Sequence, residues 1–158
     1  EAQIDRFMLK VLIDYPDRNQ EIEILKKSEL SINESLDSVL HPSDITSMID
    51  IIHEIYLDDK IREYIVDLVF ATRNPSKYGM DIKRYIEFGA SPRATIFLAK
   101  ASRVNAFLQG RAYVTPQDVK IIAPDVLRHR IILSFEAEAD DLTSDDIIKT
   151  IFESVEVP

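Results

Sequence analysis

The sequence is divided by residues that typically begin helices. Ser91-Pro92 places a capping serine before a proline at the first helical position, where the missing N–H costs nothing. Thr115-Pro116 repeats the signal, and Asp118 follows three residues after the cap. Apolar residues behind both starts recur at intervals of three and four. The pattern predicts a mainly α fold, a bundle of about five helices.

The same spacing places the helices along the chain. We expect helices to begin near Ile22, after Ser43, after Asp58 or Asp59, after Ser91, after Thr115 and near Thr143. The stripe expected to be buried in the helix after Ser91 is Phe97, Ala101, Val104 and Leu108, with Gly110 as the stop. The helix near Thr143 is expected to bury Ile147, Ile148, Ile151 and Val155. Residues 28–41 form a predicted polar connector, and residues 77–90 a loop long enough for a function or some local structure.

One segment differs from this helical pattern. Residues 7–13, FMLKVLI, are almost continuously apolar and end before Tyr15-Pro16, as in a strand buried on both faces of a parallel sheet. Such a strand needs neighbours, and the best other candidate is residues 130–135. We therefore expect the chain to be a piece of a longer protein, with 1–16 left over from a sheet-containing core and 17–158 forming the helical unit. The strand alone should self-associate or be disordered.

Composition excludes several classes of function. The chain has no cysteine, its three histidines are far apart, and neither a GxxxxGK[ST] nor a GxSxG motif occurs. Free-standing catalysis is therefore not expected. The net charge is −9, and residues 134–158 carry eight acidic residues against one lysine, which disfavours nucleic acid as a partner. No apolar run is long enough for membrane insertion, and a cytoplasmic location fits the lack of cysteine.

Two arginines are candidates for binding an anion. Arg93 is the second helical residue after Ser91, where exposed N–H groups and a cation together suit a phosphate. Arg6 directly precedes the predicted strand, so it could reach a phosphate on a neighbouring subunit. The alternative for each is a salt bridge, with a nearby carboxylate for Arg93 and with Asp5 or Glu1 for Arg6.

Several segments, in order, resemble one protein family. Residues 1–7, EAQIDRF, and residues 89–94, GASPRA, are similar to motifs of MoxR-type AAA+ ATPases. Residues 113–119, YVTPQDV, 127–130, LRHR, and 133–138, LSFEAE, look like the family's helical lid, as do 64–69 and 71–73. By this resemblance Arg6 is the arginine finger acting in trans, and Arg93 is the sensor-2 residue that touches the phosphates of ATP.

The resemblance also implies the cofactors, partners and function of the full-length protein. The full-length parent would bind ATP and Mg²⁺, and its Walker A, Walker B and sensor-1 residues would lie upstream of this chain. Its partners would be its own ATPase core, the neighbouring subunits of a hexameric ring, and proteins with a von Willebrand factor A domain. The function would be chaperone-like remodelling or maturation. Two alternatives stay open: the lid of another AAA+ protein such as a magnesium chelatase subunit, or a helical interaction module without a nucleotide role.

Overall fold

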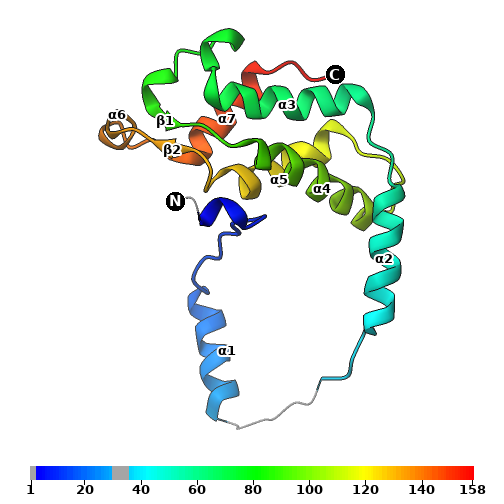
Figure 1. Ribbon diagram of the computed structural model, residues 1–158. Coiled ribbons are helices and arrows are strands. Elements are labelled where there is room, and N and C mark those ends of the chain that lie inside the picture. Colours follow the sequence, from blue (N-terminus) through cyan, green and yellow to red (C-terminus); the bar gives the residue numbers. More distant parts are fainter. Residues whose placement is uncertain (1–2, 30–35) are drawn as a thin grey trace.

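The computed structural model describes residues 3–29 and 36–158, and most of them are helical (Figure 1). The first part contains a short 3₁₀ helix, η1 (Ile4–Arg6), and then α1 (Arg18–Glu29), α2 (Pro42–Glu54) and α3 (Asp59–Arg73). No helix within these described ranges is long and apolar enough to cross a membrane. Figure 1 shows α1 and α2 projecting from the remaining helices, which pack together.

The second part is compact and contains a small sheet. It consists of η2 (Pro75–Tyr78), η3 (Lys83–Tyr85), β1 (Ile86–Phe88), α4 (Pro92–Leu108), α5 (Pro116–Leu127), β2 (Ile132–Leu133), α6 (Phe135–Ala139) and α7 (Ser144–Ser154). Strands β1 and β2 pair antiparallel, with Ile86 opposite Leu133 and Phe88 opposite Ile132. The predicted loop of residues 77–90 therefore has local structure, and the candidate strand at 130–135 contains β2.

The core lies between α3, α4, α5 and α7. Burial of apolar surface is the main favourable contribution to folding, and each of these helices places an aliphatic face inward. The largest fully buried side chains include Ile65 and Leu68 of α3, Leu98 of α4, Val119 and Leu127 of α5, and Ile147, Ile148 and Ile151 of α7. The α7 residues are those that the spacing predicts. The mainly α fold is confirmed, with seven α-helices in the described residues rather than about five.

Two predicted helix faces are wrong in detail. In α4 only Ala101 of the predicted stripe is buried, whereas Val104 is 39% and Leu108 72% exposed. The buried face consists instead of Ala94, Leu98, Ala101, Ser102 and Ala106, most of them small enough to let the neighbouring helices approach closely. Helix α2 begins after His41 instead of Ser43, and none of its residues is buried, because most of the helix projects from the bundle (Figure 1).

The predicted strand over residues 7–13 does not form. This segment lies extended without a strand partner, and Phe7, Val11 and Ile13 are exposed. A strand needs a neighbouring backbone edge, and the part of the chain that the structure describes offers none at this position. One backbone bond, from Lys10 N to the carbonyl of Asp125 at 2.8 Å, connects the segment to α5.

A buried ion pair fixes the start of α5. Asp118 is fully buried and closes a capping box with Thr115, whose N–H and Oγ1 donate to Asp118 Oδ2, both at 2.7 Å. Arg111 donates to both carboxylate oxygens at 2.7 and 2.5 Å, and Asn105 donates to Oδ1 at 2.7 Å. Burial alone would raise the pKa of Asp118, but these donors together hold it well below its ordinary value.

Candidate functional site

The turn before α4 is pinned against the end of α3. Gly89 passes so close to Thr72 that a Cβ at this position would lie 2.5 Å from the Thr72 carbonyl oxygen. The next residue, Ala90, is fully buried and donates its N–H to Thr72 Oγ1 at 2.9 Å. Only glycine fits at this close approach, so the segment GASPRA has a defined position relative to α3.

Helix α4 begins as the sequence predicts. Ser91 is the N-cap in an extended conformation, Pro92 follows, and the N–H of Arg93 donates to Ser91 Oγ at 3.2 Å. The first turn of α4 contains no acidic residue, unlike that of α5. The partial positive charge at this helix start is therefore not balanced from within the helix.

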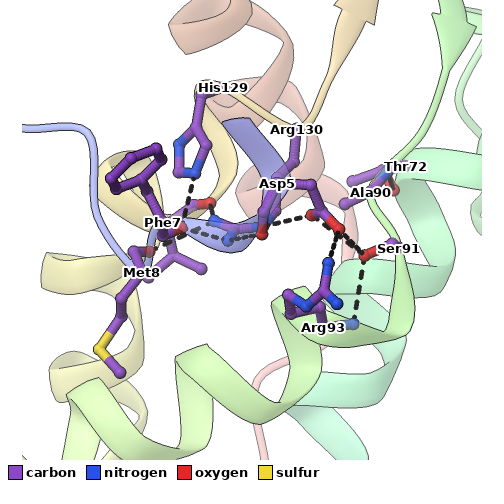
Figure 2. Close-up of polar contacts among 10 residues, drawn as sticks. Asp5, Phe7, Met8, Thr72, Ala90, Ser91, Arg93, His129 and Arg130 are labelled. Atoms are coloured by element: carbon purple, nitrogen blue, oxygen red, sulfur yellow. Dashed lines mark hydrogen bonds and ion pairs between the residues drawn. The ribbon is translucent and has the colours of Figure 1, made fainter. Parts of the chain in front are cut away.

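The negative charge that balances the start of α4 comes from Asp5, near the N-terminal end of the chain (Figure 2). Ser91 Oγ lies 3.1 and 3.0 Å from the two Asp5 carboxylate oxygens and donates to them. Arg93 Nη1 donates to Oδ2 at 2.7 Å, and Arg130 Nε donates to Oδ1 at 3.0 Å. We call these four residues, Asp5, Ser91, Arg93 and Arg130, the Asp5 junction. It joins η1 to the start of α4, through Ser91 and Arg93, and to the segment after α5, through Arg130.

The two arginines of the junction differ in exposure. The Arg93 side chain is 45% exposed, and that of Arg130 is 1% exposed. Arg130 also donates to the carbonyl oxygens of Asp5 at 2.9 Å, Phe7 at 2.5 Å and Met8 at 3.3 Å, and to that of Val126. Its guanidinium stacks on Phe97, 5.0 Å from the ring centre. Arg130 is therefore a fixed structural contact, whereas Arg93 has one side open to solvent.

Two neighbours of Arg130 extend the contact along the same segment. His129 Nε2 lies 3.1 Å from the carbonyl oxygen of Phe7, and Arg128 Nη1 donates to that of Lys10 at 2.7 Å. Arg128 is held in turn by Asp125 and Asp145. The three consecutive residues after α5, which lie in the segment LRHR, therefore bind residues 5–10 through side chains.

The electrostatics of the junction favour charged groups. Burial alone would raise the pKa of Asp5, but donation from Ser91 and Arg93 and the charge of Arg130 hold it below its ordinary value. Burial lowers the pKa of Arg130 and that of His129. The Asp5 carboxylate is therefore ionised at neutral pH, and its charge offsets one of the two positive charges of Arg93 and Arg130.

The two predicted site residues lie in different elements, Arg6 in η1 directly after Asp5 and Arg93 at the start of α4. Arg93 forms the predicted type of salt bridge, with Asp5. Arg6 is exposed and makes no ion pair with any of the described residues, so the salt bridge to Asp5 considered for it is not formed. Glu1, its other possible partner, lies outside those residues.

Sequence reasoning considered Asp5 only as a possible partner of Arg6, and it gave no role to Arg130. Both lie in segments that carry the family resemblance, but no local pattern connects residues 125 positions apart. One indication was available: residues 128–130 are a basic cluster directly after an apolar helix, and a buried arginine requires a carboxylate partner. Within the described residues, no three His, Asp or Glu side chains gather to hold a metal ion. Mg²⁺ ligands are therefore not assigned to them.

Comparison with known proteins agrees with this arrangement. Residues 79–151 match the model of the AAA lid domain. The chain is 37% identical over its whole length to Chaperone MoxR1 of Mycobacterium tuberculosis, of which it covers 42%. It is 36% identical over its whole length to the uncharacterized protein YeaC of Bacillus subtilis, of which it covers 47%.

A solved structure shows the same fold. The crystal structure of a candidate ATPase from Cytophaga hutchinsonii superposes on 99% of this chain and 48% of its own, with a TM-score of 0.93 and 38% sequence identity. The chain thus spans less than half the length of the relatives it matches. The start of α4 and the LRHR segment both lie within residues 79–151, the range that the lid-domain model matches. The chain contains an AAA lid domain over residues 79–151, and over its whole length it is similar to a MoxR-type chaperone.

Proposed function

We propose that this chain is the nucleotide-sensing lid of a MoxR-type AAA+ ATPase, and that the α/β core which binds and hydrolyses ATP is supplied by the full-length protein. In this role Arg93 contacts the phosphates of ATP bound in the same subunit. The contact pulls the start of α4, and with it the bundle, toward the core.

The observation that supports this role most directly is the environment of Arg93. Its guanidinium is half exposed at the start of a 17-residue helix whose first turn has no acidic residue. Its one carboxylate partner in the described residues, Asp5, is itself partly exposed. A phosphate resembles a carboxylate in binding an arginine through two oxygens, so it suits the same side chain.

Arg6 is the proposed finger for the neighbouring subunit. It is exposed, has no ion-pair partner among the described residues, and lies next to Asp5 in η1. A guanidinium in this position would stabilise the charge that develops on the γ-phosphoryl group during transfer. The role requires a ring of subunits, which we propose to be a hexamer.

The wider role follows from the relatives and remains a proposal. One relative is named a chaperone, and we propose that ATP hydrolysis, with Mg²⁺, drives remodelling or maturation of partner proteins, among them proteins with a von Willebrand factor A domain. The chain's own contribution is to bind phosphate oxygens and to move with them.

The test is ATP turnover by the full-length protein with Arg6→Ala or Arg93→Ala. Loss of an arginine finger typically lowers the rate on the order of a thousandfold or more. The Arg6→Ala protein should be inactive alone, and mixing it with a Walker-lysine variant should restore turnover at the mixed interfaces. Arg62→Ala is the matched control, because Arg62 is an exposed arginine of α3 paired with Asp59.

Unchanged turnover in both variants would contradict the proposal. The chain would then be a helical interaction module, and its two arginines would serve in salt bridges only. Loss of turnover in Arg6→Ala without recovery in the mixture would leave the sensor role of Arg93 in place but would contradict the finger in trans.

A further inference from the structure

We propose that Asp5 is a positioning residue that takes the place of a phosphate at Arg93 when nucleotide is absent. In this proposal, phosphate binding to Arg93 breaks the bond between Arg93 and Asp5, and η1 shifts. The shift changes the position of Arg6, the proposed arginine finger for the neighbouring subunit. The inference rests on the proposed function of Arg93 and Arg6, and it adds a connection between them within one subunit.

The contacts of Asp5 are those of an anion bound at a helix start. Its carboxylate accepts from the Ser91 hydroxyl and from Arg93 Nη1, at 3.0 and 2.7 Å, beside the unbalanced positive end of α4. These are the kinds of donors that bind a phosphate oxygen. The Asp5 carboxylate and a phosphate would therefore compete for the guanidinium of Arg93, because the same N–H group cannot bond fully to both.

The Asp5 junction allows one of its ion pairs to break while the other stays. Arg93 is 45% exposed and can turn toward a ligand. Arg130 is 1% exposed and is anchored by the carbonyl oxygens of Asp5, Phe7 and Met8. When Arg93 leaves, Asp5 keeps its bond to Arg130. The exchange therefore moves η1 toward Arg130 and does not release it from the bundle.

The movement reaches Arg6 through a single peptide bond. Asp5 and Arg6 both lie in η1, a single 3₁₀ turn closed by a bond from Phe7 N to Ile4 O at 3.0 Å. A short closed turn transmits a shift of one residue to the next, because few backbone angles are free to absorb it. The Arg6 side chain is exposed and would move with the turn.

The first experiment measures the affinity of the full-length protein for a fluorescent, non-hydrolysable ATP analogue. Asp5→Asn preserves the shape of the side chain and removes its charge. We expect it to tighten binding roughly two- to fivefold, the typical strength of a partly exposed ion pair. In an Arg93→Ala background, Asp5→Asn should not change the affinity for the analogue, because Asp5 and the phosphate no longer compete for Arg93.

The second experiment measures the effect on the neighbour. In mixed rings, a Walker-lysine subunit contributes its finger to an intact subunit without turning over ATP itself. Adding Asp5→Asn to the Walker-lysine subunit should lower turnover by the intact neighbour several-fold. Asp59→Asn is the matched control, because it removes an exposed aspartate that is also paired with an arginine.

The outcomes separate this inference from the proposed function. If Arg93→Ala alone leaves affinity unchanged, the sensor role itself fails. If Arg93→Ala weakens binding but Asp5→Asn tightens it equally in both backgrounds, Asp5 acts by general charge repulsion and the exchange is refuted. If the mixed rings turn over equally with and without Asp5→Asn, the connection to Arg6 is refuted.

Discussion

Asp118 and Asp5 are two aspartates in the same chemical setting. Each accepts from a hydroxyl residue that precedes a proline-started helix, and each pairs with arginine. Their partners differ in sequence distance: those of Asp118 are 3, 7 and 13 residues away, and those of Asp5 are 86 to 125 away. Asp118 is fully buried, whereas the Asp5 side chain is 23% exposed.

The difference shows how one interaction serves two purposes. The Asp118 pair is completed by its own helix and the preceding turn, and its burial makes it permanent. The Asp5 pair exists only when η1 lies against the bundle, and solvent or a ligand can reach Arg93. We therefore expect the first to act on stability and the second on the position of a movable segment.

The largest effect on stability should follow Asp118→Asn. Removing one member of a buried ion pair leaves the other charge without compensation, and with Arg111 partly exposed we expect a loss of about 2–3 kcal/mol in the free energy of unfolding. Chemical denaturation of the protein measures it. Asp59→Asn, in an exposed pair, should change the unfolding free energy by less than about 0.5 kcal/mol. Equal effects of the two would contradict the comparison.

Two glycines test the same comparison through the backbone. Gly89→Ala places a methyl group 2.5 Å from the Thr72 carbonyl oxygen, so the start of α4 must shift, at a cost of about 2 kcal/mol. Gly110→Ala, next to Arg111, meets no atom within 4 Å, but its φ of +68° costs about 1 kcal/mol.

Only Gly89→Ala should weaken nucleotide binding, because only Gly89 positions Ser91 and Arg93. Denaturation and nucleotide titration of both variants check this. A weaker affinity in Gly110→Ala of similar size would show that any loss of stability disturbs the site.

Asp118 should contribute to the pH dependence of stability. Its pKa is lowered in the folded protein from an ordinary value of 3.8, so its contribution is complete above that value and is lost as the pH falls below it. The difference in unfolding free energy between the wild type and Asp118→Asn should be constant above about pH 5. Below pH 4 it should shrink by at most about 1.4 kcal/mol per pH unit. A constant difference down to pH 2.5 would contradict the assignment.

The smallest effect on stability should come from Asp5→Asn. The pair is partly exposed, so we expect a change of less than about 1 kcal/mol in global unfolding. Amide exchange should instead rise locally, at Lys10, whose N–H bonds the Asp125 carbonyl. Exchange in α3 and α7 serves as the internal control. Faster exchange throughout the bundle would show that Asp5 is a global stabiliser like Asp118.

The sequence predicts what is local. The caps at Ser91 and Thr115, the start of α3 after Asp58 and the buried stripe of α7 all follow from residues a few positions apart. The buried face of α4 was mispredicted because alanines, not the larger apolar residues, face the neighbouring helices. Short α6 was missed, since five residues are too few to show a period.

The candidate site divides in the same way. Arg6 and Arg93 are predicted site residues because each lies in a recognisable local pattern, and the mixed-ring measurement tests their proposed roles. Asp5 and Arg130 were not found, because their meeting depends on how η1 packs after the bundle has formed. Residues 7–13 were expected to be a strand because their composition is apolar, but composition alone supplies no partner edge.

The binding of residues 7–10 by Arg128, His129 and Arg130 uses the carbonyl oxygens of the segment and none of its side chains. This contact therefore imposes no choice of side chain at Phe7, Met8 or Lys10, and any residue other than proline could replace each of them without losing one of these hydrogen bonds. The exposed apolar character of the segment is thus independent of its attachment, so the attachment and the outward-facing surface can evolve separately.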